Sequence, residues 1–185
     1  MNNKIIVSLN NTSPEILKTE LSKYPNIGSV AAVSHIPAAG FTYGEDFKRA
    51  LDEKEWTDIS YFSVDEDYLK NIEVSMVTGN YFSAANGSSN RNLIVLNEAA
   101  VKAFHFDSPQ DAVGQEIILK TDSSHKQVIG VVKDYNHQML MEKLTPMVLV
   151  YNPEEYRLLQ VQYTGTFDQA GKTIETALTL RSTRL

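Results

Sequence analysis

The stretch from Val128 to Tyr151 constrains the fold of this chain more than any other part of its sequence. It opens with an apolar run, residues 128–132, whose length and β-branched side chains are typical of a buried strand. A polar exit at 134–137, a short amphipathic segment and Pro146 follow, and a second apolar run at 147–151 comes directly after the proline. Because proline interrupts both helices and central strands, the stretch predicts two separate buried strands.

The composition is that of an ordinary globular protein, with 42% hydrophobic and 22% charged residues among 185. This length is enough to bury a core, as one large domain or as two small lobes. The formal net charge of −6 and a pI near 5.2 argue against binding nucleic acid or anionic lipid by bulk electrostatics, because both require a positive surface. Lys and Arg are scattered, without a basic run that would override this balance.

The sequence contains no stretch that approaches the ~18 apolar residues needed to cross a bilayer. Its N-terminal residues, MNNKIIVS, lack the apolar core of a secretory signal peptide. Taken alone, these features would indicate a soluble cytoplasmic protein. The lack of cysteine does not distinguish compartments, because it removes both a disulfide framework and a thiol site.

Both ends of the chain predict strands joined to helices. A strand at 4–9, a helix that begins at the Ser13-Pro14 pair and a strand at 29–35 form a β-α-β unit. The apolar face of its helix consists of Leu17, Leu21 and Tyr24. A strand at 158–163 and a helix from Asp168 mirror this arrangement at the C-terminal end. We therefore expect the two ends to lie in one α+β unit.

The middle of the chain alternates short strands with capped helices. Residues 46–55 fit either a helix or one half of a β-hairpin that leads into 56–64, and we favour the hairpin. Asp65 and Asn97 each precede an apolar, helix-periodic segment, and we expect both to cap helices. A hairpin across 115–134 follows. The core residues expected in this part are Val128, Val132, Leu93, Val95, Phe104 and Ile117.

Candidates for catalysis or metal binding are few. The four histidines lack metal-ligand spacing, and no cysteine is present to complete a zinc set. The best polar cluster lies at 134–137, where a hydrolase could use such groups as a general base and its orienting partner. No activated nucleophile accompanies it, so we expect Asp134 and Asn136 to satisfy backbone groups where the strand ends. We expect no catalytic residue, no metal site and no cofactor.

Three phrases carry a resemblance to a known family. They are VDEDYLKNIEV from Val64 with TGNYFS from Thr78, LIVLNEAAVKAF from Leu93 with DAVGQ from Asp111, and VIGVVKDYNHQ from Val128 with its proline and second strand. In this order and spacing they resemble the extracytoplasmic domain of MacB/FtsX-type ABC transporter permeases, over roughly residues 17–178. The pattern is most similar to the antimicrobial-peptide or macrolide export permeases of Bacteroidetes-like bacteria.

The chain departs from the family pattern at two places. At Gly79-Asn80 the family often has Gly-Arg, and at His105 glycine is usual. Neither departure concerns a catalytic group, but both leave the type of permease open.

The resemblance implies an α+β fold with two lobes. A porter-like β-α-β lobe next to the membrane would be built from both chain ends, residues 1–64 plus 147–185. A mixed α/β, sabre-like lobe, residues 65–146, would be inserted into it. Such an insertion requires that its entry and exit points lie close together.

The resemblance also implies a function without catalysis, because ATP hydrolysis in this family belongs to a cytoplasmic ATPase. The chain would be an excised, soluble part of a permease at the periplasmic, extracytoplasmic face of the inner membrane. It would pass ATP-driven movement of flanking membrane helices to the export or release of a peptide, macrolide or lipoprotein, or to a periplasmic or outer-membrane partner. The parent permease would be a dimer that works with its cognate ATPase. The alternative is a free-standing soluble domain that binds a peptide or lipid.

One candidate contact surface emerges from apolar side chains in expected loops. Aromatic residues and methionines are enriched where proteins bind partners. The same side chains could instead pack into the interface between the lobes, which is the interpretation that we favour. The residues concerned are Phe41, Tyr43, Met139 and Met141.

Overall fold

A computed structural model describes residues 3–10, 12–36, 43–49, 55–135 and 145–182. The strands are β1 (Asn3–Ser8), β2 (Ile27–Val33), β3 (Gly44–Arg49), β4 (Thr57–Ser63), β5 (Met76–Gly79), β6 (Leu93–Asn97), β7 (Glu116–Leu119), β8 (His125–Val132), β9 (Met147–Val150) and β10 (Leu158–Tyr163). The helices are α1 (Pro14–Leu21), α2 (Tyr68–Ile72), α3 (Glu98–Ala103), α4 (Pro109–Ala112) and α5 (Phe167–Ser182), with 3₁₀ segments η1 (Ala84–Asn92) and η2 (Pro153–Glu155). The fold is therefore α+β.

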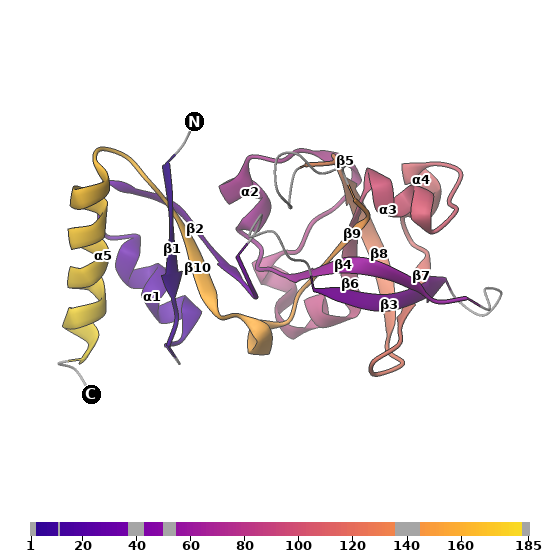
Figure 1. Ribbon diagram of the computed structural model, residues 1–185, viewed down its shortest axis with the longest axis horizontal. Coiled ribbons are helices and arrows are strands. Elements are labelled where there is room, and N and C mark those ends of the chain that lie inside the picture. Colours follow the sequence, from indigo (N-terminus) through magenta and orange to yellow (C-terminus); the bar gives the residue numbers. More distant parts are fainter. Residues whose placement is uncertain (1–2, 11, 37–42, 50–54, 136–144, 183–185) are drawn as a thin grey trace.

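A small sheet of three strands occupies one end of the molecule (Figure 1). β10 lies in its middle and pairs antiparallel with β1 on one side and β2 on the other. The N-terminal β-α-β segment thus has the predicted order of elements, but its two strands are not neighbours, because a strand from the other end of the chain separates them. Both chain ends contribute to this unit, as expected from their matching patterns.

Helices α1 and α5 cover one face of the small sheet. α1 begins as predicted: the Ser13 hydroxyl accepts a hydrogen bond from Ile16 N at 3.5 Å, and Pro14 occupies the first turn. Leu17 and Leu21 are fully buried against the sheet. Together with residues of all three strands and of α5, they form an outer core that includes Val7, Val30, Leu159, Val161, Ala170 and Ile174.

A large sheet of seven strands forms the rest of the molecule, in the order β5-β8-β6-β9-β4-β3-β7. β7, at one end of this order, also pairs with β8, so the sheet closes on itself and leaves β5 outside the ring. β3 and β4 pair antiparallel, which confirms the hairpin expected at 46–64. β4 and β9 are parallel, as are β6 and β8.

The division between the sheets differs from the lobe boundaries that we expected. β3, β4 and β9 belong to the large sheet, although the expected lobe of residues 1–64 plus 147–185 included them. β9 pairs with β4 and β6, so the residues after Pro146 continue the large sheet instead of returning to the small one. The return comes only at β10, after η2.

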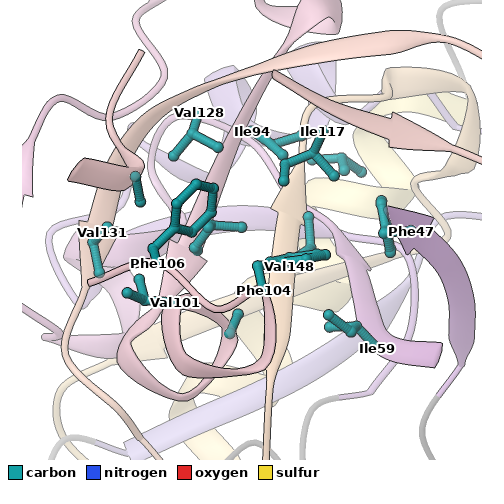
Figure 2. Close-up of a cluster of buried hydrophobic side chains, with 14 of the residues drawn as sticks. Phe47, Ile59, Ile94, Val101, Phe104, Phe106, Ile117, Val128, Val131 and Val148 are labelled. Atoms are coloured by element: carbon teal, nitrogen blue, oxygen red, sulfur yellow. The ribbon is translucent and has the colours of Figure 1, made fainter. Parts of the chain in front are cut away.

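The large sheet has a core on each face. Inside the closed sheet, side chains from the strands pack against Phe104 and Phe106, which follow α3. Figure 2 shows the Phe106 side chain among Val101, Val128 and Val131, and Phe104 beside Val148. Its other face packs on the small sheet and α2 through an inter-sheet core that contains Val33, Phe62, Tyr68, Val95 and Leu149.

Strand β9 shows why the apolar runs in the sequence are continuous. Val148 and Val150 point into the ring, whereas Met147 and Leu149 point into the inter-sheet core. A strand buried on both faces needs apolar residues at every position. The predicted core residues Val128, Val132, Val95, Phe104 and Ile117 are buried as expected, and Leu93 is half-buried.

Candidate functional site

The two sheets meet at residues 63–65, the last residue of β4 and the two that follow it, which we call the junction segment. Two backbone hydrogen bonds connect it with β2 and the residue after it: Ser34 N donates to Ser63 O at 2.9 Å, and Asp65 N donates to Ala32 O at 3.1 Å. The Ser63 hydroxyl adds a link to the chain after β9, since it donates to Asn152 O and accepts from Asn152 N, both at 3.0 Å. The junction segment therefore extends both sheets.

Val64, in the centre of this segment, is fully buried and contacts both sheets. It forms an isolated antiparallel bridge with Val33 of β2 and donates its N–H to Val150 O of β9 at 2.9 Å. The Tyr156 hydroxyl donates to Val64 O at 2.9 Å. The Tyr81 hydroxyl donates in the same way to the next carbonyl, that of Asp65, at 3.2 Å. Every backbone polar group of Val64 is thus paired, as buried groups require.

The Asp65 carboxylate accepts hydrogen bonds from three neighbouring segments at the junction. Its Oδ2 accepts from Ala32 N of β2 at 2.8 Å and from Lys18 Nζ of α1 at 2.6 Å. Its Oδ1 accepts from Asp67 N, in the turn before α2, at 3.1 Å. We expected Asp65 to cap α2, and this was wrong: the residue at the N-cap position is Asp67, which makes no side-chain capping bond. Asp65 instead braces the preceding turn against α1 and β2.

Burial changes the protonation chemistry of this ion pair. Burial raises the pKa of Asp65 to about 6, although Lys18 and the Ala32 N–H act in the opposite direction. For Lys18, burial lowers the pKa, but Asp65 and Asp67 together more than offset it, and the pKa lies above its ordinary value. Lys18 stays protonated at every physiological pH, whereas Asp65 titrates in the weakly acidic range.

Helix α2 is attached to the small sheet through Asn71. Its side-chain amide donates to Ser29 O and the Ser29 hydroxyl at 2.9 Å, and to Gln160 O at 3.0 Å. Asn71 is fully buried. A buried amide that bridges two strands fixes where the helix lies on the sheet, since leaving it unpaired costs ~1–3 kcal/mol.

Tyr43 is the candidate contact residue that the structure describes, and its side chain is 58% exposed. Its ring lies 4.7 Å from that of His35, which in turn lies 4.1 Å from Phe62 of the inter-sheet core, measured between ring centroids. Tyr43 therefore offers an exposed aromatic face that is supported from beneath. The other three candidates, Phe41, Met139 and Met141, lie outside the described residues.

A hollow of about 320 Å³ lies beside Tyr43, between the two places where the chain crosses from one sheet to the other. Ser34 and His35 belong to the first crossing, and Glu155 and Arg157 to the second. Tyr43, Gly44, Glu45 and Tyr61 line the hollow from the large sheet.

The polar cluster that follows β8 has a structural role at Asp134. Asp134 Oδ1 accepts from Ala99 N in the first turn of α3 at 2.9 Å, and Glu98 accepts from Asp134 N at 3.2 Å. Asn97 caps the same helix as predicted, by accepting from Ala100 N at 2.9 Å. Asn136 and His137 lie outside the described residues. Within the part of the chain that the structure describes, no three His, Asp or Glu side chains gather to form a metal site.

Comparison with known sequences assigns the chain to a family. The MacB-like periplasmic core domain matches residues 5–183, nearly the whole chain. The chain belongs to this family. It is the type of domain that ABC transporter permeases carry on the periplasmic side, in transporters that work with a cytoplasmic ATPase and whose periplasmic domains are generally non-catalytic. No curated protein sequence matches the chain.

Solved structures of three transporter domains share the fold. The periplasmic region of MacB from Actinobacillus actinomycetemcomitans superposes with a TM-score of 0.67 at 15% identity, covering 96% of this chain and 83% of that one. The extracellular domain of the noncanonic ABC-type transporter YknZ from Gram-positive bacteria gives 0.62 at 15% identity, with 92% and 88% covered. A domain of a permease protein from Porphyromonas gingivalis gives 0.53 at 11% identity, with 80% and 61% covered.

Two further findings bear on this MacB-like domain. None of the helices in the described ranges combines the length and apolar character of a membrane-crossing segment. Sequence reasoning did not identify the junction, because the pairing of Lys18 with Asp65 joins residues 47 positions apart. The role of Asn71 could have been suspected from the sequence. Asn71 shares a helical face with Tyr68 and Ile72, where an apolar side chain would be expected.

Proposed function

We propose that this domain passes movements of the membrane helices of an ABC transporter permease to a substrate or partner outside the membrane. The movement originates in ATP hydrolysis by the cognate cytoplasmic ATPase, and the parent permease acts as a dimer. The exported or released substrate is a peptide, a macrolide or a lipoprotein. In this proposal the small sheet with α1 and α5 is the porter-like, membrane-proximal unit, and the large sheet is the sabre-like unit.

The junction segment is the observation that carries this proposal. A displacement of the small sheet reaches the large sheet through backbone hydrogen bonds to Ser63 and Asp65 and through a close-packed inter-sheet core. Close-packed interiors have low compressibility and transmit strain. The two sheets therefore act as one body, and the domain works by shape and attachment. In such a domain, His137→Ala leaves transport nearly intact.

The test compares ATP hydrolysis with export in the full-length parent permease. Asp65→Ala removes the acceptor shared by Lys18 and Ala32 N, and Asn71→Ala removes the bridge from α2 to the small sheet. We expect both variants to hydrolyse ATP at near-normal rates while export falls. Glu175→Gln, an exposed change on α5, is the control. Unchanged export per ATP in both variants, with normal folding confirmed by circular dichroism, would contradict the proposal.

A further inference from the structure

The hollow beside Tyr43 is placed where an occupant would touch both connections between the sheets. Ser34 and His35 line it from the first connection, and Glu155 and Arg157 from the second. These are the positions at which the chain passes between the small and the large sheet. An occupant of this hollow would bridge the two units without entering either core.

The floor of the hollow is electronegative. The Tyr61 hydroxyl donates to Glu155 Oε2 at 2.8 Å, and Asn152 donates to the other oxygen of the same carboxylate at 2.9 Å. Burial raises the pKa of Tyr61, and the carboxylates of Glu155, Glu45 and Asp122 raise it further. Several negative charges therefore act at one point of the floor, which favours a cation there.

Arg157 does not neutralise this floor through an ion pair. Its Nη1 donates to the backbone oxygens of Glu154 at 2.7 Å and Tyr156 at 3.0 Å, which hold the guanidinium along the second connection. Arg157 takes part in none of the salt bridges within 4.0 Å found among the described residues. The carboxylate of Glu155 remains paired with neutral donors.

The rim of the hollow is apolar and rigid. Tyr43, which lines the hollow, is 58% exposed and is one of the few large apolar side chains that face solvent in the described chain. The tilted ring contacts of Tyr43 with His35, and of His35 with Phe62, hold the exposed ring in place. A pre-ordered aromatic ring loses little conformational entropy when it binds a partner.

We propose that this hollow binds a basic segment of an extracytoplasmic partner protein. One Lys or Arg side chain of that segment points at the Tyr61–Glu155 floor, and its aliphatic part lies against the Tyr43 ring. Carboxylates and aromatic faces both attract such a cation, and the apolar rim covers its methylene groups. The inference rests on the proposed function only in requiring a partner outside the membrane, and it names the chemistry of that partner.

The test is a titration of the 185-residue chain with three nine-residue Gly/Ser peptides, whose central residue is Arg, norleucine or Glu. Amide chemical shifts of Tyr43, Gly44, Glu45 and Arg157 report binding. We expect the Arg peptide to bind at least about tenfold more tightly than the norleucine peptide, equivalent to ~1.4 kcal/mol, and the Glu peptide not to bind. The affinity of the Arg peptide should fall at high salt, because salt screens the partly exposed carboxylates of the hollow.

Two variants and a matched control locate the site. Glu45→Gln removes a charge but keeps an acceptor for the Thr121 hydroxyl, and Tyr43→Ala removes the aromatic rim. Each substitution should lower the affinity for the Arg peptide about fivefold or more, whereas Glu175→Gln on α5 should leave this affinity unchanged. Equal binding of the three peptides, tightest binding of the norleucine peptide, or binding of spermine without the Arg peptide would overturn the inference. None of these outcomes would affect the coupling assay in the full-length permease, so the two proposals fail separately.

Discussion

Lys18 Nζ lies 2.6 Å from Asp65 Oδ2 and joins the helix on the outer face of the small sheet to the end of a strand in the large sheet. The Lys18 side chain is 19% exposed and the Asp65 side chain 4% exposed, so water screens this ion pair less than it screens a surface pair. Asp67 lies 2.7 Å from the same ammonium group and is 43% exposed. This ion pair is the charged part of the junction, and the protonation of its Asp65 carboxylate can be measured through the pH dependence of stability.

Stability should depend on pH through Asp65. Because burial raises the pKa of Asp65 from 3.8 to about 6, the native state binds this proton more tightly than the unfolded chain between those values. The contribution of this carboxyl to the free energy of unfolding therefore falls as pH rises from about 4 to 6, and is constant above that range. The raised pKa of Lys18 has no effect until the pH exceeds the ordinary lysine value of 10.5.

Asp65→Asn removes this titration while keeping an oxygen that can accept from Ala32 N. Urea denaturation of both proteins at pH 4 and pH 7 isolates the effect, because the other carboxyl groups cancel in the difference. As pH rises from 4 to 7, the free energy of unfolding of the wild type should fall by roughly 2–3 kcal/mol relative to that of the variant. A difference that stays flat, or changes with the opposite sign, would show that Asp65 is not buried as described.

His105→Gly should stabilise the domain. His105 follows α3 with φ of +56°, the left-handed conformation that favours glycine, and its side chain is exposed. The neighbouring bonds, Phe106 N to Val101 O and His105 N to Lys102 O, are those of a Schellman motif. Relief of the left-handed strain should raise the free energy of unfolding by about 1 kcal/mol. The same change at His125, in the extended strand β8, should lower it by about 0.5–1 kcal/mol.

Gly130→Ala should destabilise the domain, because a methyl group there would overlap Asn80 O and the Met76 side chain. Here β5 pairs antiparallel with β8, with Gly79 opposite Gly130, and the two backbones approach closely. We expect the free energy of unfolding, measured by thermal or urea denaturation, to fall by about 1–3 kcal/mol. Gly171→Ala in α5 meets no atom within 4 Å and serves as the control, with a gain of up to about 1 kcal/mol. Equal effects of the two substitutions would contradict this close approach of the two strands.

Local patterns in the sequence predicted local structure well. Ser13-Pro14 and Asn97 start helices because their capping chemistry involves residues only three positions away. The apolar runs at 128–132 and 147–151 fall on β8 and β9, since strands buried on both faces need continuous apolar sequence.

Long-range pairing could not be predicted in the same way. The sequence of β9 does not indicate that its partners are β4 and β6, because an apolar strand could be buried equally well in either sheet. The insertion of β10 between β1 and β2 likewise depends on contacts between opposite ends of the chain. For the site, the pattern drew attention to Tyr43, but the support of its ring by His35 and the acidic floor at Tyr61 arise only from tertiary packing.

The claim that the two sheets act as one body can be tested by locking them together. Val33 and Val64 are fully buried and form an antiparallel bridge between the hydrogen bonds Ser34 N to Ser63 O and Asp65 N to Ala32 O. Such a non-hydrogen-bonded pair places Cα atoms ~4.5 Å apart, within the range of a disulfide. The chain has no cysteine, so Val33→Cys with Val64→Cys gives one defined cross-link.

The decisive measurement is ATP-driven export by the full-length permease carrying this cysteine pair, in a background without other cysteines, before and after oxidation. We predict that the oxidised protein exports at the same rate per ATP hydrolysed as the reduced one, because the cross-link joins parts that already move together. Export that stops on oxidation and returns on reduction would contradict the account, since it would mean that the sheets must separate at the junction.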